Sequence, residues 1–358
     1  MKKIVVLILT VIILSFTVSC SQGNSTAEKP AVEKQVNSAA KKADEVLKSR
    51  GFKGVVSLTK NGKEVYRYAN GKDSDGNDFT ADSSMYIGSV SKQFCAVSII
   101  MLRDKGKLNL NDKLDKYFPE YKTGKIITIK NLLTMRSGIM DMVNEGHCSG
   151  VSYNNSEKEN IKAVKKWIFS QKLKFKPDSK YAYSNSNYFL LADIVKQISG
   201  QSYHEFVRKN IFKPLKMNHS GFIEDVEDNP SWAKGLMKGE NGESINPRGL
   251  PNGAGDIASN AADMEKWMRA LSDGTLISEK SFREMIKDYS PESATRYGYG
   301  LERLYKDGIG HMGVIGTYCA LDYINEKNNI RLFAASNKSS AQSYIGSLPM
   351  QLLNALNN

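Results

Sequence analysis

The sequence is poor in the side chains from which metal and redox sites are built. Its 358 residues include four cysteines and four histidines. No Cys-x-x-Cys or His-Glu-x-x-His pattern occurs, and the histidines are too scattered for a local metal signature: His147, His204, His219 and His311. A Walker loop and the Gly-x-Ser-x-Gly elbow of α/β-hydrolases are also absent. We therefore expect no metal, no cofactor and no α/β-hydrolase fold.

Acidic residues are missing from the N-terminal segment, where two lysines precede an apolar run from Ile4 to Phe16. That run is too short to span a bilayer comfortably, and Thr17-Val-Ser-Cys20 follows it as a lipobox-like cleavage site. We interpret residues 1–19 as a lipoprotein-type signal peptide and Cys20 as the lipidated N-terminus of the mature chain. The polar residues 20–30 then form a flexible tether. The sequence thus predicts a protein anchored on the extracytoplasmic face of the cell membrane, with plain secretion or an uncut anchor as alternatives.

The remaining cysteines are too few, and odd in number, for a disulfide framework. Without Cys20, the chain keeps Cys95, Cys148 and Cys319. Cys95 belongs to an apolar run with helical length and Cys319 to a strand-like run, so we expect both to pack as apolar residues.

Basic residues outnumber acidic ones. Lys and Arg total 50 against 38 Asp and Glu, a net charge of +12, and removal of the two lysines in residues 1–19 leaves 12 − 2 = +10. An exported basic protein is attracted to anionic lipid head groups and phosphate-rich wall polymers by a field that salt weakens. No nucleic-acid-binding motif is present, so we expect no nucleic acid partner. A monomer is expected.

The hydrophobic patterns predict an α+β fold in which both ends of the chain build one antiparallel sheet. An amphipathic helix precedes a hairpin of residues 54–60 and 63–69, which turns at Asn61-Gly62. Because a lone hairpin is marginally stable, we expect it to join the C-terminal strands. The expected C-terminal elements are strands at 297–305, 308–314, 317–324 and 330–336 and a helix at 345–356. Residues 92–267 form a largely helical middle region, and residues 31–358 a single domain.

A serine precedes a lysine by three residues at four places, and the surroundings select one of them. Ser57 and Lys60 lie in a strand-like run, so their side chains point to opposite faces. Ser38 and Ser231 lie in polar surface segments. Ser89 follows Gly88 and opens a long apolar run, so one helical turn places Lys92 beside it. A desolvated amine can take the proton of a serine nucleophile, and a helix N-terminus presents N–H groups to developing negative charge.

Two further motifs follow in order, Tyr183-Ser184-Asn185 and His311-Met312-Gly313. With Ser89-Val-Ser-Lys92 they resemble the motifs of the serine β-lactamase and penicillin-binding protein superfamily. The resemblance is to its class C-like branch, with D-alanyl-D-alanine carboxypeptidases and esterases, and runs from about Gly54 to the C-terminus. It implies a β-lactamase/transpeptidase-like fold.

The resemblance also implies roles for individual residues. Ser89 would be the acylated nucleophile, Lys92 its hydrogen-bonded amine, and Tyr183 a phenolate-like base that relays protons to the leaving group. Asn185 would orient the substrate amide. His311 and Gly313 would line the edge strand along which the substrate lies, and the backbone N–H groups of Ser89 and Val314 would form the oxyanion hole.

Three departures from the family pattern stand out. His311 occupies the position where penicillin-hydrolysing members carry Lys, which weakens the β-lactamase interpretation. An ordinary imidazole is partly charged near neutral pH, so His311 either holds a substrate carboxylate or stays neutral and hydrogen-bonds Tyr183. Pro177-Asp178 replaces a frequent Pro-Gly, and Met135-Arg136 replaces a His-Thr pair, with Arg136 expected in the cleft wall.

These observations predict a membrane-anchored serine hydrolase that works through an acyl-enzyme on Ser89. The expected substrates are D-alanyl amides or esters of the cell envelope, carried by wall peptides or D-alanylated polymers. A β-lactamase is the nearest alternative. The other is a penicillin-binding or scaffold module that is acylated by a β-lactam ligand and never turns over.

Overall fold

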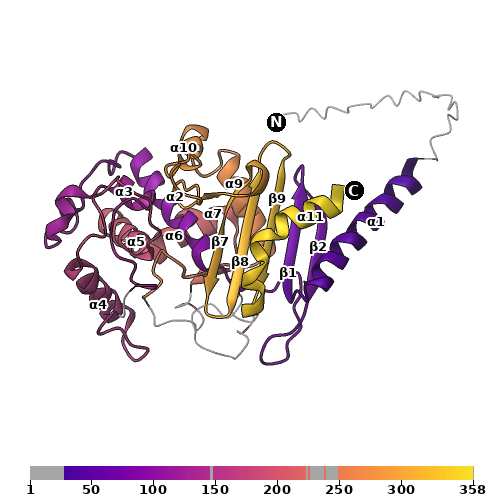
Figure 1. Cartoon of the computed structure of the whole chain (residues 1–358), viewed down its shortest axis with the longest axis horizontal. Coiled ribbons are helices and arrows are strands. Elements are labelled where there is room, and N and C mark those ends of the chain that lie inside the picture. Colours follow the sequence, from indigo (N-terminus) through magenta and orange to yellow (C-terminus); the bar gives the residue numbers. More distant parts are fainter. Residues whose placement is uncertain (1–27, 146–147, 223–224, 226–237, 239–248, 358) are drawn as a thin grey trace, which may run out of the picture.

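The computed structural model describes residues 28–145, 148–222, 225, 238 and 249–357. The predicted signal peptide, Cys20 and most of the predicted tether lie outside this range. Helix α1 (Glu28–Ser49) begins inside the segment predicted as tether, three residues before the predicted start of the domain. The chain folds into a six-stranded antiparallel sheet with helices on both faces and a helical region at one side (Figure 1).

Both ends of the chain build the sheet, as predicted. Its order is β2-β1-β9-β8-β7-β6, so the N-terminal hairpin joins the C-terminal strands through β1 and β9. The hairpin consists of β1 (Gly54–Lys60) and β2 (Lys63–Asn70). The C-terminal strands are β6 (Glu302–Arg303), β7 (Ile309–Ile315), β8 (Tyr318–Asn325) and β9 (Ile330–Ser336).

The strand predicted at 297–305 is the main error in this layer, because only its two-residue end pairs with β7. Gly300 has a φ of +70°, and the Gly298 N–H donates to the Leu301 carbonyl across a tight turn (2.7 Å). A residue in the left-handed region interrupts an extended strand, so the aromatic pattern of this segment reflects burial of Tyr297 and Tyr299 rather than sheet pairing.

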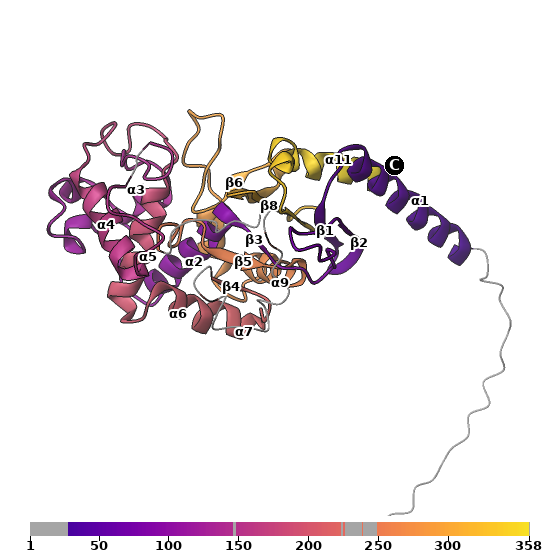
Figure 2. The same cartoon turned by 90° about the horizontal axis from the view of Figure 1, so that it is seen from below.

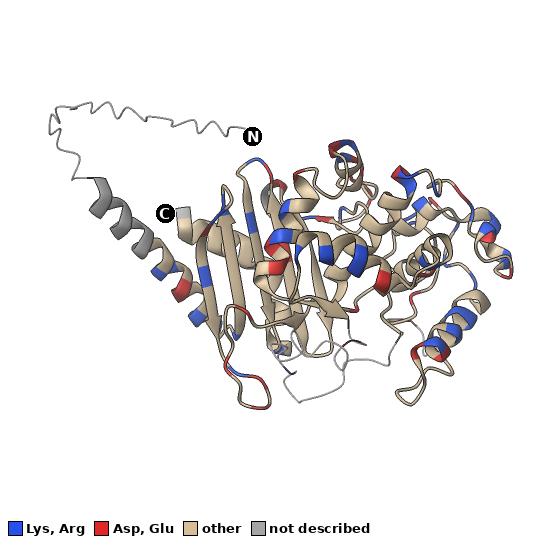
Figure 3. Ribbon diagram, turned by 180° about the vertical axis from the view of Figure 1, so that it is seen from behind, with Lys and Arg blue, Asp and Glu red and all other residues tan. Residues whose placement is uncertain are grey.

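Helices cover the two faces of the sheet (Figure 2). One face packs against α1 and the C-terminal helix α11 (Leu348–Asn357), through a cluster that includes Leu47, Leu321 and Leu352. The other face packs against α9 (Ala261–Ser272). Every residue of β8 is buried, and Figure 3 shows the central strands largely free of charge while Lys and Arg gather on helices such as α4 (Glu157–Ser170). Burial on both faces explains why β8 is apolar along most of its length.

The middle region is mainly helical, as predicted. Its longer helices are α2 (Ser91–Asp104), α4 and α5 (Asn185–Ser199), with short helices α3 (Ile129–Leu133), α6 (Tyr203–Val207) and α7 (Lys213–Leu215) around them. Helix α10 (Glu279–Met285) follows after the end of this region. A small sheet that the sequence pattern did not indicate lies here, in the order β3-β5-β4: β3 (Met85–Tyr86), β4 (Gly221–Phe222) and β5 (Ile257–Ser259). Strands of two or three residues are too short to show alternation.

The three cysteines in the described residues are free thiols, and Cys95 and Cys319 are buried as predicted. Within the described part of the chain, no helix has the length and apolar character needed to cross a membrane.

Candidate active site

Ser89 lies in the turn that leads into the buried helix α2. The turn is the 3-10 segment Gly88–Val90, and α2 continues from Ser91. Ser89 borders a cleft of about 500 Å³ between the sheet and the helical region. The described residues that line the cleft are Ser89, Val143, Asn144, Tyr183, Asn185, Pro251, Ala254, Gly255, Glu302, His311, Met312, Val314, Ile315 and Gly316. Five of the predicted site residues thus share one cavity.

Two glycines allow the Ser89 turn to lie directly against strand β7. A Cβ on Gly313 would stand 1.9 Å from the Ile87 carbonyl oxygen and 2.8 Å from the Ser89 nitrogen. Gly88 has a φ of +50°, and a Cβ there would stand 2.7 Å from the Val314 nitrogen. We call this pair, Gly88 and Gly313, the glycine contact. It brings the backbone nitrogens of Ser89 and Val314, the predicted oxyanion-hole donors, to the same wall of the cleft.

Lys92 lies under Ser89 with no exposed surface. Its Nζ donates to Ser89 Oγ (3.0 Å), to Asn185 Oδ1 (2.8 Å) and to the Ala254 carbonyl (2.6 Å). Burial lowers the pKa of Lys92 to about 7, although the nearby Asp141 carboxylate opposes that shift. The amine can therefore exist unprotonated near neutral pH, in hydrogen-bonding contact with the serine.

Tyr183 completes the group around Ser89. Its side chain lines the same cleft as Ser89, and Lys92 Nζ lies 5.0 Å from the centre of its ring. Burial raises the pKa of Tyr183 well above its ordinary value, so the side chain is a neutral phenol. The role of Tyr183 as a phenolate-like base stays a prediction, and Lys92, which hydrogen-bonds Ser89 and has a lowered pKa, is the group poised to accept its proton.

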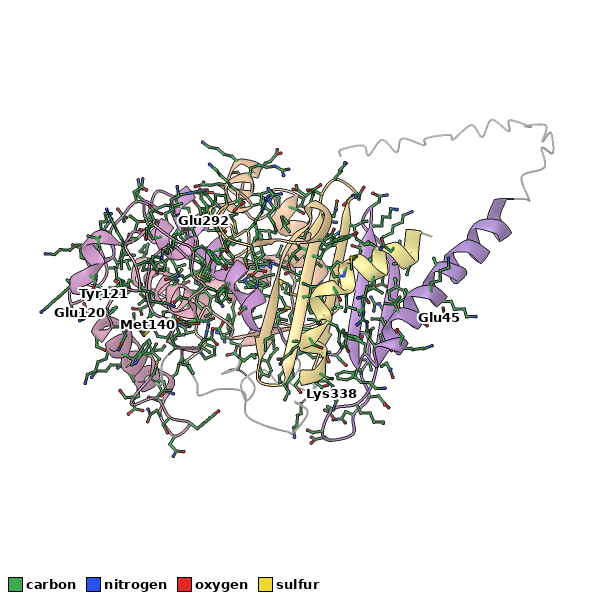
Figure 4. All side chains as sticks on the ribbon, viewed as in Figure 1. Glu45, Glu120, Tyr121, Met140, Glu292 and Lys338 are labelled. Carbon is green, nitrogen blue, oxygen red and sulfur yellow. The ribbon has the colours of Figure 1, made fainter. Side chains whose placement is uncertain are left out.

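Asn185 begins α5 and connects Lys92 to a buried carboxylate that the sequence analysis missed. Its backbone N–H and its Nδ2 both donate to Asp141 (3.1 Å each), while its Oδ1 accepts from Lys92. Asp141 is 2% exposed, and it also accepts from the Val143 N–H (3.1 Å). The preceding residue, Met140, which Figure 4 labels, accepts a hydrogen bond at its carbonyl from Ser186 Oγ of α5 (2.7 Å). No motif marks Asp141, because Asn185, the partner that links it to Lys92, comes from α5.

His311 is buried and hydrogen-bonded on both ring nitrogens. Nδ1 donates to the Met312 carbonyl (2.6 Å), which leaves Nε2 to accept from the Tyr297 hydroxyl (3.4 Å). Burial lowers the pKa of His311 below its ordinary value, although Glu302 Oε1 lies 3.6 Å from Nε2. His311 is therefore neutral at neutral pH, which favours the second of its two expected roles, a neutral hydrogen-bonded imidazole, over a charge for a substrate carboxylate. Its hydroxyl partner is Tyr297 rather than Tyr183.

A second buried carboxylate ties the nucleophile helix to the sheet. Asp322 on β8 accepts from Gln93 Nε2 of α2 (2.7 Å) and from the His311 N–H (2.8 Å). Gln93 Oε1 in turn accepts from Trp267 Nε1 of α9 (2.9 Å). One side chain of α2 thus fixes the helix against β8 and α9, directly behind Ser89.

The other two departures from the family pattern, at Met135-Arg136 and Pro177-Asp178, do not line the cleft. Arg136 was expected in the cleft wall but does not line it: it ion-pairs with Glu292, which Figure 4 labels, and with Asp178 (3.6 Å). Asp178 has a φ of +68°, a conformation that suits the glycine expected there from the family resemblance. Of the rejected serines, Ser57 is buried on β1 while Lys60 is exposed, as predicted. Ser231 and the side chain of Ser38 lie outside what the structure describes.

Comparison with known proteins agrees with this geometry. The family model described as "Beta-lactamase" matches residues 39–353. The chain belongs to the beta-lactamase family. It is 35% identical over 284 residues to "Putative penicillin-binding protein PbpX" of Bacillus subtilis (strain 168), covering 77% of this chain and 68% of that protein. It is 29% identical over 298 residues to the teichoic acid D-alanine hydrolase of Staphylococcus aureus, covering 80% and 71%.

Solved structures show the same fold. A D-amino acid amidase from Ochrobactrum anthropi SV3 superposes with a TM-score of 0.76 at 24% identity, covering 91% of this chain and 99% of that one. An octameric penicillin-binding protein homologue from Pyrococcus abyssi gives a TM-score of 0.70 at 27% identity, covering 90% and 77%. The family and its named relatives make this chain a beta-lactamase-family hydrolase.

The glycine contact generates a first prediction. In Gly313→Ala the new methyl group collides with the Ile87 carbonyl, so Ser89 must move away from β7. We expect about a 10²-fold or larger loss of kcat/KM, as for removal of an oxyanion donor, and about 1–3 kcal/mol of destabilisation in thermal unfolding. Gly346→Ala is the control, because its methyl group would meet its nearest neighbour, Met312 Sδ, at 3.5 Å. Equal activity of the two variants would contradict the account.

Lys92 generates a second prediction. Its amine must lose a proton before it can accept one from Ser89, so kcat/KM for an uncharged ester should rise as pH increases through about 7. The Asp141 carboxylate opposes the lowered pKa of Lys92, and Asp141→Asn should therefore move the rise to lower pH.

The control for that shift is Asp193→Asn, which removes a similarly buried carboxylate that pairs instead with Lys165 (2.9 Å). Its pH profile should match that of the unmodified protein. A profile that is flat across about pH 5 to 9 in the unmodified protein would exclude Lys92 as the group that activates Ser89.

Proposed function

We propose that this protein is an extracytoplasmic serine hydrolase that forms an acyl-enzyme on Ser89 and releases D-alanine from D-alanyl esters or amides of the cell envelope. The observation that carries the proposal is the hydrogen bond between Ser89 Oγ and a fully buried Lys92 whose pKa is about 7. A serine becomes an effective nucleophile when an adjacent unprotonated base can take its proton.

The chemical steps follow from the positions of the side chains. Lys92 takes the proton of Ser89 Oγ as that oxygen bonds to the substrate carbonyl carbon. The resulting oxyanion accepts hydrogen bonds from the N–H groups of Ser89 and Val314. The bond to the leaving group then breaks, and Tyr183, a neutral phenol that lines the cleft, gives its phenolic proton to the leaving oxygen or nitrogen and takes up the proton that Lys92 received from Ser89. Water attacks the acyl-enzyme by the same route in reverse, which frees the acid and restores Ser89.

The substrate class is supported by the relatives and by the cleft. One relative is named for hydrolysis of D-alanine from teichoic acid, and the superposed amidase is named for D-amino acid amides. Asn185 projects into the cleft with its amide held by Asp141, which suits it to orient the acyl part of a substrate. The lipobox-like sequence that ends at Cys20 supports a position at the outer face of the membrane, where such polymers occur.

The test is release of D-alanine. Purified protein is incubated separately with a D-alanylated polymer and with wall peptides, and free D-alanine is measured while intact-mass spectrometry follows the protein. We expect release and a transient acyl adduct. Ser89→Ala should abolish the adduct and reduce turnover by about 10⁶-fold, as deletion of a nucleophile does elsewhere. The control Ser57→Ala should behave like the unmodified protein.

The other candidate functions give different results in the same assay. Hydrolysis of a β-lactam without release of D-alanine would identify a β-lactamase. A permanent β-lactam adduct without turnover would identify a penicillin-binding or scaffold module. Labelling that persists in Ser89→Ala would contradict the assignment of the nucleophile.

A further inference from the structure

The described cleft wall lacks the positive charge that would hold a carboxylate of the substrate. None of the described residues that line the cleft is Lys or Arg, and Glu302 is their single acidic side chain. Lys92 does not line the cleft, because it is fully buried below Ser89, and its amine carries no charge in the form that accepts a proton from Ser89. The described cleft surface therefore has one fixed charge, and that charge is negative.

Glu302 has little to neutralise it. It lies on β6 with its side chain 20% exposed, and its one ion-pair partner among the described residues is His311 at 3.6 Å. His311 is neutral at neutral pH because burial lowers its pKa, and its Nδ1 proton is used by the Met312 carbonyl. A carboxylate in this position has a field that reaches the nearby parts of the cleft, since the protein around it screens less than water does.

The field of Glu302 acts on the side of the cleft where the leaving group departs. Tyr183, which passes the proton to that group, has its ring centre 6.1 Å from the ring of His311, and Glu302 Oε1 lies 3.6 Å from Nε2 of the same ring. Burial is the main cause of the raised pKa of Tyr183, and the Glu302 charge raises this pKa further. The leaving group must lie against Tyr183, and so within the range of Glu302.

We propose that Glu302 is a specificity-determining residue that disfavours a leaving group with a carboxylate next to the scissile bond. This inference rests on the proposed function and narrows it. The preferred substrates are D-alanyl esters of alcohols and D-alanyl amides whose leaving amine carries no carboxylate. D-alanyl-D-alanine termini and β-lactams are disfavoured, since both place a carboxylate two bonds from the nitrogen that leaves.

A matched pair of esters tests this proposal. The D-alanyl esters of glycolamide and of glycolate have leaving groups of nearly the same shape, one neutral and one anionic. We expect kcat/KM to favour the glycolamide ester by about 10-fold or more at low ionic strength, as expected for two like charges in a partly buried cleft. In Glu302→Gln, which keeps the shape of the side chain, this ratio should fall to within about twofold of the ratio for hydrolysis by hydroxide.

The control is Glu326→Gln, which removes a partly exposed carboxylate that pairs with Arg283 (2.7 Å) and does not line the cleft. It should leave the ratio unchanged. Thermal unfolding of each variant checks that it folds. If Glu302→Gln does not fold, Glu302→Ala is measured in its place. The preference of the unmodified protein for the glycolamide ester over the glycolate ester is also a test by itself.

The outcomes separate this inference from the proposed function. Turnover of both esters at a ratio that Glu302→Gln leaves unchanged would overturn the role of Glu302 and leave the D-alanyl hydrolase intact. If Glu326→Gln shifted the ratio of the two esters by the same amount, the role of Glu302 would also be overturned, because the preference would then follow from the net charge of the protein. Turnover of neither ester, with folded protein, would overturn the proposed function itself.

Discussion

The close approach of the Ser89 turn to strand β7 is the constraint on which the site depends. Side chains at Gly88 or Gly313 would collide with backbone atoms of the opposite segment, at 2.7 Å and 1.9 Å respectively. Because the contact is between backbones, the N–H groups of Ser89 and Val314, the predicted oxyanion-hole donors, are held by rigid elements rather than by flexible side chains. Such preorganised dipoles need no reorientation when negative charge develops, which is how they lower a barrier.

Buried polar groups hold this contact in place, and each is partnered across elements. Gln93 ties α2 to β8 and α9, while Asn185 ties Lys92 to Asp141. Burying an amine costs free energy unless its protons are bonded, and here the same burial lowers the pKa of Lys92 to about 7. The arrangement that stabilises the core is therefore also the one that makes the amine a usable base. Burial lowers the pKa of His311 in the same way, so this side chain is neutral although it lies beside Glu302.

The sequence alone predicted the features that depend on local pattern. The hairpin at Asn61-Gly62, the pairing of both chain ends and the helical turn that joins Ser89 to Lys92 are all in the structure. The ordered motifs also brought Tyr183, Asn185 and His311 to one cleft. What the sequence could not predict are properties set by distant segments. Asp141 has its role only because Asn185 of α5 lies beside it, and His311 is neutral only because it is buried. Glu302 lines the cleft from β6, a strand of only two residues.

The most direct test of the central claim is a crystal structure of the protein with a fluorophosphonate bound covalently to Ser89. The tetrahedral phosphorus of that adduct stands in for the carbon of the acylation intermediate, and one of its oxygens for the oxyanion. The account predicts that this oxygen lies about 3 Å from the backbone nitrogens of both Ser89 and Val314, with Lys92 Nζ still beside Ser89 Oγ. An adduct whose oxygen points into solvent, or a separation of the Ser89 turn from β7 in the complex, would contradict it.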